Sequence, residues 1–462
     1  MPGMVSSRTR PAGPAERRPA GRRIAWFRRA LAAAIALVLP LTAGPVHART
    51  DILWWHAMSG ELGRELETLA ADFNAFQPDY HIIPVYKGTY TETVMAAIFA
   101  FRSNAQPAIV QAAEVSTATM MAAKGATYPV FELMRDLRAP FDASAYLPAV
   151  AGYYTDIDGN MLSFPFNAST PILYYNKTRF AQAGLDPAVA PRTWPEVEVA
   201  ARKLRDAGMP CGFTTHWPSW VNVENFSALH NLPIATKSNG LGGLDASLTI
   251  DNPVLVRHIG KLAEWQRTKL YDYSGRAMSA EPRFHRGECG IFLGSSAARA
   301  DIRARADFEV GYGELPYWPD VPGAPQNTII GGASLWVLAG RPQVEYAGVA
   351  AFFTYLSRPD VQAAWHQKTG YLPITRAAFD LSRQQGFYDR NPGTVIAIEQ
   401  ITKKPPTENS KGLRLGSFVL IRSAIEDEME AAFAGKVSAA EALANAQMRG
   451  NKLLRQFENA SR

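Results

Sequence analysis

Strand-like and helix-like hydrophobic patterns alternate along the chain from residue 51 onward. The apolar run 51–56 is typical of a buried strand, and segment 60–76 has leucines and a phenylalanine at helical spacing. The same alternation predicts a strand at 80–86, a helix at 91–103 and a strand at 107–114. Alternation of this kind predicts an α/β fold with parallel sheets whose faces are covered by helices.

The pattern continues in the second half of the chain. Thr193–Glu196 has the form of a capping box, and segment 252–269 predicts a helix opened by Asn-Pro. Segment 289–302 predicts a strand, a Gly-Ser-Ser turn and a helix. A strand at 331–339 and a helix at 345–356 follow. We therefore expect two α/β lobes with the chain crossing between them and a ligand cleft at their junction.

Residues 1–48 have the pattern of a secretory signal peptide. Eight arginines precede a short apolar run, which ends in Val46-His47-Ala48. Small residues at the −3 and −1 positions, Val46 and Ala48, predict cleavage after Ala48 and export to the periplasm. A retained anchor is the alternative, but the apolar run is short for a transmembrane span.

Removal of this leader changes the charge balance. The whole chain has a formal net charge of +6, and residues 1–48 contribute eight Arg and one Glu. Six minus seven leaves −1 for the remaining 414 residues. Bulk charge therefore gives no support to nucleic-acid or anionic-membrane binding. The length suits two or three domains, and we expect a monomer.

Enzyme and metal signatures are missing from the sequence. The eight histidines form no HxH or HExxH pair, and neither a GxSxG elbow nor a phosphate loop occurs. Cys211 and Cys289 do not have metal-site spacing. In an oxidising compartment they could form a disulfide, or they could be two separate core thiols. We predict no cofactor, no metal and no catalytic residue.

Several segments have features of binding sites, each with a structural alternative. Ser295 stands where a strand enters a helix, which suits either an anion or a plain N-cap. The glycine pair 331–332 allows close backbone approach or a simple bend. Trp217 and Trp220 could form a platform for a ligand or pack in the core. The carboxylates Glu426 and Glu428 are interpreted as a solvated helical face.

The segment WHQKTGYLPIT ends a helix that begins at Pro359 and is capped by Gly370. His366 and Lys368 fall in its last turn, where positive charge suits the helix dipole. Tyr371 follows the cap and is the residue expected to reach the cleft.

The motifs WWHAMSGELG, VYKGTY, FPFNASTPILYYNK, WPSWVNVENF, PQNTIIGGASLWV and KGLRLG, in this order, resemble the family 1 extracellular solute-binding proteins. The resemblance is to the sn-glycerol-3-phosphate-binding members that serve ABC importers. It implies a maltose-binding-protein-like (class II) fold, with two lobes joined by a multi-strand hinge. The implied boundaries are 49–167 plus 333–367 for the N-terminal lobe and 168–332 plus 368–462 for the C-terminal lobe.

The resemblance also implies a ligand site. The positions that match the family's motifs are Tyr90, Glu114, Ser169, Trp217, Trp220, Ser295, Gly332, Tyr371 and Arg422. Most of these would surround a phosphate, whereas Glu114 would accept bonds from glycerol hydroxyls and the tryptophans would cover the carbon skeleton. The family's pattern has a tyrosine where this chain has Ala113, which implies a roomier cleft.

The implied function is capture of sn-glycerol-3-phosphate, and possibly glycerophosphodiesters, for a membrane permease and its cytoplasmic ATPase. A glycerophosphocholine- or oligosaccharide-selective binding protein is the first alternative, since the tryptophan pair would serve any of these ligands. A secreted phosphodiesterase is a remote alternative, because it would need metal ligands or a nucleophile.

Overall fold

The computed structural model describes residues 49–462, so the predicted signal peptide lies outside the described residues. The first strands and helices follow the predicted order closely, because each has a buried apolar face at the expected period. These elements are β1 (Thr50–His56), α1 (Gly60–Phe76), β2 (Tyr80–Tyr86), α2 (Tyr90–Arg102), β3 (Ile109–Ala113), η1 (Glu114–Ser116), α3 (Thr117–Ala122), β4 (Thr127–Tyr128), α4 (Val130–Asp136), η2 (Ala143–Ala145), α5 (Pro148–Tyr154) and β5 (Phe164–Ser169).

The chain then builds a second group of elements. They are β6 (Pro171–Asn176), α6 (Lys177–Gln182), α7 (Trp194–Asp206), β7 (Cys211–Thr215), η3 (Trp220–Asn225), α8 (Phe226–Leu229), α9 (Thr236–Asn239), α10 (Pro253–Arg267), β8 (Tyr271–Asp272), α11 (Glu281–His285), β9 (Cys289–Ser295), η4 (Ser296–Ala298), α12 (Arg299–Arg305) and β10 (Val310–Gly313). The predicted capping box at the start of α7 is present, with Thr193 and Glu196 bonding reciprocally.

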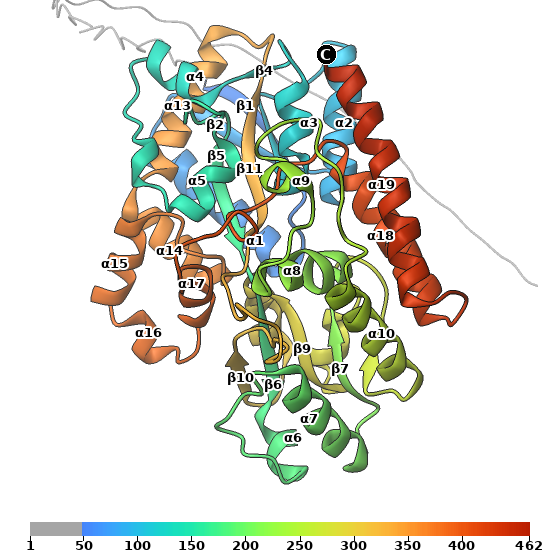
Figure 1. Cartoon of the computed structure of the whole chain (residues 1–462). Coiled ribbons are helices and arrows are strands. Elements are labelled where there is room, and N and C mark those ends of the chain that lie inside the picture. Colours follow the sequence, from blue (N-terminus) through green and yellow to red (C-terminus); the bar gives the residue numbers. More distant parts are fainter. Residues whose placement is uncertain (1–48) are drawn as a thin grey trace, which may run out of the picture. The chain divides into compact units, whose positions relative to one another are not determined.

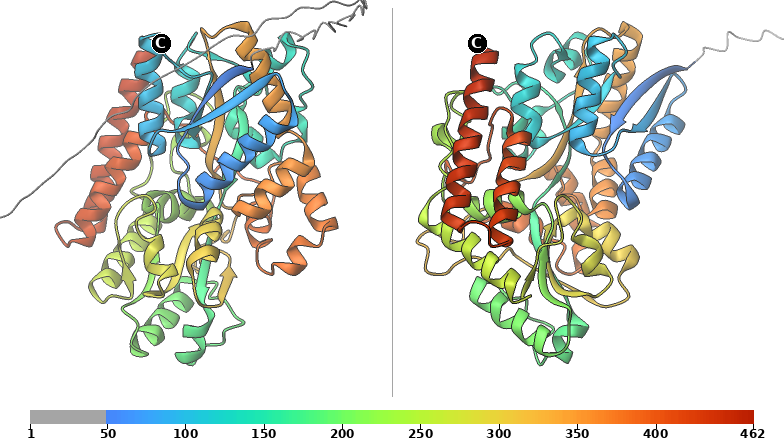
Figure 2. Two further views of the ribbon diagram at one scale, coloured as in Figure 1. Left: turned by 180° about the vertical axis from the view of Figure 1, so that it is seen from behind. Right: turned by 90° about the vertical axis from the view of Figure 1, so that its right-hand side faces the viewer.

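The last part of the chain is one strand followed by helices. Its elements are β11 (Gly331–Leu338), α13 (Gln343–Leu356), α14 (Pro359–Thr369), α15 (Arg376–Gln384), α16 (Phe387–Arg390), α17 (Ile396–Ile401), α18 (Phe418–Phe433) and α19 (Ala439–Ser461). Helices α18 and α19, red in Figure 2, lie side by side, and both also contact α10.

The strands form two separate sheets. One has the order β2-β1-β3-β11-β4, with β5 also paired to β11, and the other has the order β10-β6-β9-β7-β8. The predicted parallel pairing holds for β1 with β2 and β3, and for β7 with β8 and β9. The prediction was wrong for β5, β6, β10 and β11, which pair antiparallel. These strands begin or end where the chain passes from one sheet to the other, so they enter their sheets from the opposite end.

The two crossings place strand ends next to each other. Thr170 alone separates β5 of the first sheet from β6 of the second. The return crossing delivers β11, the orange strand in Figure 1, between strands from the start of the chain. Since ligands of α/β proteins bind outside the carboxyl ends of their strands, the ends of β3, β5, β7 and β9 are where a site is expected. The exact lobe boundaries stay a prediction.

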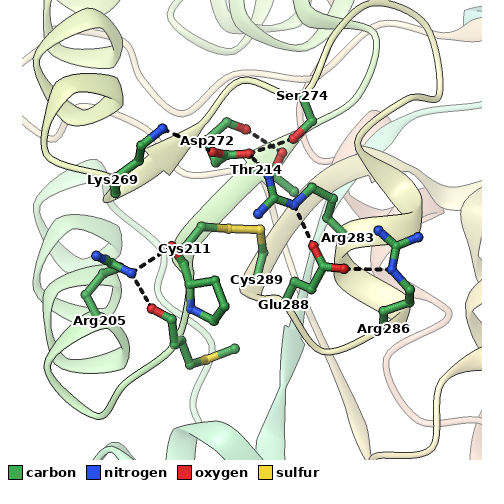
Figure 3. Close-up of a disulfide and its surroundings, with 12 residues drawn as sticks. Arg205, Cys211, Thr214, Lys269, Asp272, Ser274, Arg283, Arg286, Glu288 and Cys289 are labelled. Carbon is green, nitrogen blue, oxygen red and sulfur yellow. Dashed lines mark hydrogen bonds and ion pairs between the residues drawn. A yellow bond between two sulfur atoms is a disulfide. The ribbon is translucent and has the colours of Figure 1, made fainter.

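Cys211 and Cys289 are joined by a disulfide, which settles the alternative left open by the sequence. They are paired residues of the parallel strands β7 and β9, with Cα atoms 4.8 Å apart. Figure 3 shows the bond beside an ion pair between Arg283 and Glu288, whose Nε and Oε2 atoms lie 2.8 Å apart. The disulfide ties together two strands whose far ends lead to Trp217 and Ser295.

We expect the double variant Cys211→Ser, Cys289→Ser to lower the free energy of unfolding by about 2–4 kcal/mol, because the bond closes a long loop in the unfolded chain. Urea unfolding of the wild type with and without reductant gives the matched comparison. Equal midpoints for the oxidised wild type and the double variant would contradict a stabilising role.

Candidate functional site

The guanidinium of Arg422 lies between two carboxylates that come from different sheets. Glu114 follows β3 of the first sheet, and Glu224 lies in η3, which follows β7 of the second. Arg422 Nη2 donates to Glu114 Oε1 at 2.8 Å and to Glu224 Oε2 at 2.7 Å. Its Nε donates to Glu224 Oε1 at 2.7 Å. The three side chains are only 13%, 6% and 1% exposed, so this is a buried ion cluster at the junction of the sheets.

A wide helical turn holds Glu224 in place. Segment η3 is π-helical, a rare geometry that often marks functional sites. Ser219 Oγ donates to Glu224 Oε1 at 3.1 Å. Asn225 fixes the end of the turn, since its amide donates to the Trp220 carbonyl and its Oδ1 accepts from the backbone of Ile329. Glu224 therefore has little freedom to move away from Arg422.

Negative charge exceeds positive charge around this cluster. Glu426 lies one helical turn beyond Arg422 on α18, and burial raises its pKa to about 7 although Arg422 and Arg276 oppose that shift. Burial also raises the pKa of Glu114, again against the pull of Arg422. Burial would lower the pKa of Arg422, but Glu224 and Glu114 raise it, so the guanidinium stays charged. The interpretation of Glu426 as a solvated carboxylate is wrong, because this face of α18 packs inward.

Two tyrosines and an amide form a second polar group. Asn167 donates from Nδ2 to Tyr90 Oη at 3.1 Å, and its Oδ1 accepts from Gln111 Nε2 at 2.9 Å. Burial raises the pKa of Tyr90 to about 12, and the nearby charge of Glu114 acts in the same direction. Burial also raises the pKa of Tyr371, with Tyr90 as its neighbour. Both tyrosines are therefore neutral hydrogen-bonding groups close to the ion cluster.

Strand pairing brings the glycine pair to the same place. In the register of β11 with β5, Gly331 lies opposite Ser169 and Gly332 opposite Ala168. Gly332 has φ +106°, and a Cβ built there would lie 1.9 Å from the Asn167 carbonyl oxygen. A Cβ on Gly331 would lie 2.5 Å from Trp220 Cζ2. A larger residue would need movement of the backbone at Gly332 and of the Trp220 indole at Gly331.

The two tryptophans occupy different environments. Trp220 is buried in the core around the second sheet, as the core-packing alternative predicted, and its Nε1 has no hydrogen-bond partner within residues 49–462. Trp217 is only partly buried and adopts a positive φ of 45°. Trp217, unlike Trp220, therefore still has exposed surface that a ligand could cover.

Ser295 caps the turn after β9, and its Oγ accepts from the backbone of Ala297 at 3.1 Å. It lies opposite Pro171, two residues beyond Ser169. The backbone N–H of Ser295 also donates to His216 Nε2, and His216 immediately precedes Trp217. The N-cap interpretation of Ser295 is confirmed, and the cap places it beside the strand crossing.

The structure thus brings Arg422 and Glu114 into contact, joins Tyr90 and Tyr371 to Asn167, and pairs Ser169 with Gly331, whereas Gly332 lies opposite Ala168. Sequence reasoning missed Glu224, Asn167, His216 and Glu426. The only available signal for Glu224 was a lone carboxylate in the apolar and amide-rich segment WVNVENF.

One charge assignment on α14 is also wrong. His366 does lie in the last turn before Gly370, which has a left-handed φ of 79°. Burial lowers the pKa of His366 to about 3, and the neutral ring bonds Ser382 at 2.6 Å. Only Lys368 supplies positive charge there, and it pairs with Glu65 at 3.2 Å.

Within residues 49–462, no group of three or more His, Cys, Asp or Glu side chains is arranged to hold a metal ion. The same part of the chain has no helix long and apolar enough to cross a membrane.

We expect Glu426→Gln to change how stability depends on pH. The folded wild type keeps a proton on Glu426 up to about pH 7, whereas an unfolded chain loses it near 4.5. The free energy of unfolding of the wild type therefore contains a contribution that falls as pH rises through this window. The variant lacks it and should be more stable than the wild type at alkaline pH by up to about 3 kcal/mol.

Chemical denaturation of both proteins across this pH range measures the effect. A constant difference between the two proteins at every pH would contradict the assignment of a raised pKa to Glu426.

Comparison with known proteins identifies close relatives. Residues 68–393 match the family described as bacterial extracellular solute-binding protein. The sn-glycerol-3-phosphate-binding periplasmic protein UgpB of Salmonella typhimurium is 50% identical over 429 residues, which cover 93% of this chain and 98% of that protein. The protein of the same name from Yersinia pseudotuberculosis is 49% identical, with 93% and 97% covered.

Solved structures confirm the predicted two-lobed, maltose-binding-protein-like fold. UgpB of Mycobacterium tuberculosis, in complex with glycerophosphocholine, matches with a TM-score of 0.73 at 22% identity, covering 88% of this chain and 99% of that one. Maltose-bound MalE3 of T. maritima matches with a TM-score of 0.69 at 18% identity, covering 88% and 99%.

Proposed function

Because the chain belongs to the bacterial extracellular solute-binding proteins, we propose that it is the solute-binding component of an ABC importer for sn-glycerol-3-phosphate. The observation that carries the proposal is the near-full-length similarity to the Salmonella protein. The ligand would be captured between the two lobes and delivered to a permease with its cytoplasmic ATPase. We further propose that the protein acts as a monomer, binds no nucleic acid and catalyses no reaction.

The periplasm is the compartment that fits this function. Residues 1–48 would direct export and be removed after Ala48. The disulfide between Cys211 and Cys289 agrees with an oxidising compartment.

The ligand would use donors that surround the strand ends. Arg422 makes its three hydrogen bonds through Nε and Nη2, so the two N–H groups of Nη1 are the donors left for a phosphate. Ser169, Ser295, Tyr90, Tyr371 and the Gly332 N–H would complete the phosphate contacts. The partly buried Trp217 would cover the glycerol carbons, while Trp220 belongs to the core against which Trp217 packs. Charge-assisted bonds from Arg to phosphate are the strongest of these.

Glu114 would change partners when ligand binds. It contributes one bond to Arg422, whereas Glu224 contributes two. A phosphate at Arg422 would repel both carboxylates, and Glu114 holds the guanidinium less firmly. Its carboxylate would then accept bonds from the glycerol hydroxyls, as the resemblance implies.

Binding would shift an equilibrium between open and closed lobes. The proposed contacts come from strands of both sheets, so a ligand contacts all of them only when the lobes are together. A ligand that binds one conformation better raises its population. The closed form would be the one that the permease recognises.

A glycerophosphodiester is a second candidate ligand. Ala113 is small and buried beside Glu114, and a partly buried aromatic side chain such as Trp217 suits a quaternary ammonium group. An oligosaccharide would also use the tryptophans, but it would offer no anion to the Nη1 donors of Arg422.

Arg422→Lys tests the phosphate assignment. Lysine keeps the positive charge between the carboxylates but lacks the planar fork, so we expect affinity for glycerol-3-phosphate to fall by about a hundredfold or more. Titration calorimetry of residues 49–462 measures it. Arg422→Ala is a poorer test, because it would leave two buried carboxylates unpaired and destabilise the fold.

Arg449→Lys is the matched control, since Arg449 pairs with Asp427 and Glu428 on α18 outside the proposed contacts. Unchanged ligand affinity in Arg422→Lys would contradict the phosphate role.

Incubation with glycerophosphocholine tests the absence of catalysis. We expect no free choline above the buffer control at high protein concentration over many hours. Choline release that increases with protein concentration and is lost in Glu114→Gln would replace the binding-protein proposal by a phosphodiesterase.

A further inference from the structure

Glu224 is the charged side chain of the candidate site that its neighbours restrain most firmly. Its carboxylate is 1% exposed and occupies two donors of Arg422 side-on, while Ser219 donates to the same carboxylate. A bidentate pair of this kind fixes both the position and the orientation of the guanidinium. Because Glu224 is almost fully buried and Arg422 is only 13% exposed, the pair is expected to persist when a ligand arrives.

The consequence of this pairing is electrostatic. The charge of Glu224 cancels that of Arg422, so a phosphate at Nη1 interacts with an ion pair instead of a bare cation. The other charged groups facing the cluster are Glu114 from η1, Glu426 on α18 and Arg276 from the loop after β8. Arg276 is partly exposed and already bonds Asp427 and Glu430, so it adds little positive charge at the ligand. Tyr153 and Tyr371 are buried, Tyr90 is partly buried, and all three are neutral.

We propose that Glu224 is a positioning residue that also sets charge selectivity: it holds Arg422 for the phosphate and penalises the second negative charge of a phosphomonoester. The inference rests on the proposed function, since it requires the phosphate to lie at Arg422. Nothing in the similarity to known binding proteins assigns this role to Glu224.

Two ligands separate the effect of charge from that of position. Above its second pKa of about 6, the phosphate of glycerol-3-phosphate is a dianion. The phosphate of glycerophosphocholine is a monoanion at every pH of interest. Repulsion by Glu224 acts once on the diester phosphate and twice on the monoester phosphate, whereas loss of positioning weakens both ligands alike.

The experiment is calorimetric titration of wild type and Glu224→Gln with both ligands at about pH 8, above the second phosphate pKa of about 6. Glutamine keeps a carbonyl oxygen that can accept from Nε but removes the charge. We expect the affinity ratio of glycerol-3-phosphate to glycerophosphocholine to rise by about five- to twentyfold in the variant. At about pH 5.5, where most of the monoester carries one charge, the rise should shrink to about twofold or less.

Glu458→Gln is the matched control. Glu458 is a buried carboxylate on α19 that pairs with Arg455 and Arg462 and contacts no proposed ligand residue. The affinity ratio of glycerol-3-phosphate to glycerophosphocholine in Glu458→Gln should equal that of the wild type. Glu224→Asp, which keeps the charge on a shorter side chain, should weaken both ligands without changing the ratio.

An unchanged or lower ratio in Glu224→Gln at both pH values would overturn the proposal. If Glu224→Gln fails to fold, a changed ratio in Glu224→Asp would overturn it instead. Failure of the proposed function is recognised separately, because Arg422→Lys would then leave the affinity for both ligands unchanged.

Discussion

The burial of one guanidinium between carboxylates from two sheets is the interaction on which the site depends. Desolvating three charged groups costs several kcal/mol for each ion, and only good geometry with additional hydrogen bonds offsets that cost. Arg422 meets this requirement because Glu224 matches its fork and Glu114 accepts its remaining Nη2 donor. The π-helical turn that carries Glu224 and the raised pKa of Glu426 both belong to the surroundings of this cluster.

The two chain crossings make this cluster possible. Thr170 lies between β5 and β6, and its Oγ1 donates to Thr328 Oγ1 at 2.6 Å on the returning crossing. Gln400 donates to Thr328 Oγ1 and to the Pro171 carbonyl, so both crossings are held by buried hydrogen bonds. Glu114 and Glu224 lie on opposite sides of these crossings. A change in lobe arrangement would therefore alter the contact between Glu114 and Arg422 before the contact between Glu224 and Arg422.

Glycine at two adjacent positions is a second constraint on the site. Gly331 allows the indole of Trp220 to lie against the backbone, and Gly332 allows the Asn167 carbonyl to approach within a distance that any side chain would block. Asn167 in turn holds Tyr90 through a hydrogen bond. A backbone requirement therefore determines where three polar and aromatic side chains lie.

The sequence by itself determined the order and type of nearly all elements, the capped ends of α7 and α14, and the family. These features depend on periodicity, capping residues and motif order, all of which act over a few neighbouring residues. It also pointed to the predicted ligand residues, but only through resemblance. Tertiary structure alone decided which strands run antiparallel, that the two cysteines bond, that His366 is neutral and that Glu426 is buried. Tertiary structure alone also brought Glu224 into an ion pair with Arg422, which lies more than a hundred residues away in sequence. The pKa of a carboxylate and the partner of a guanidinium depend on burial and on charges brought together by distant segments, and no local pattern in the sequence encodes either.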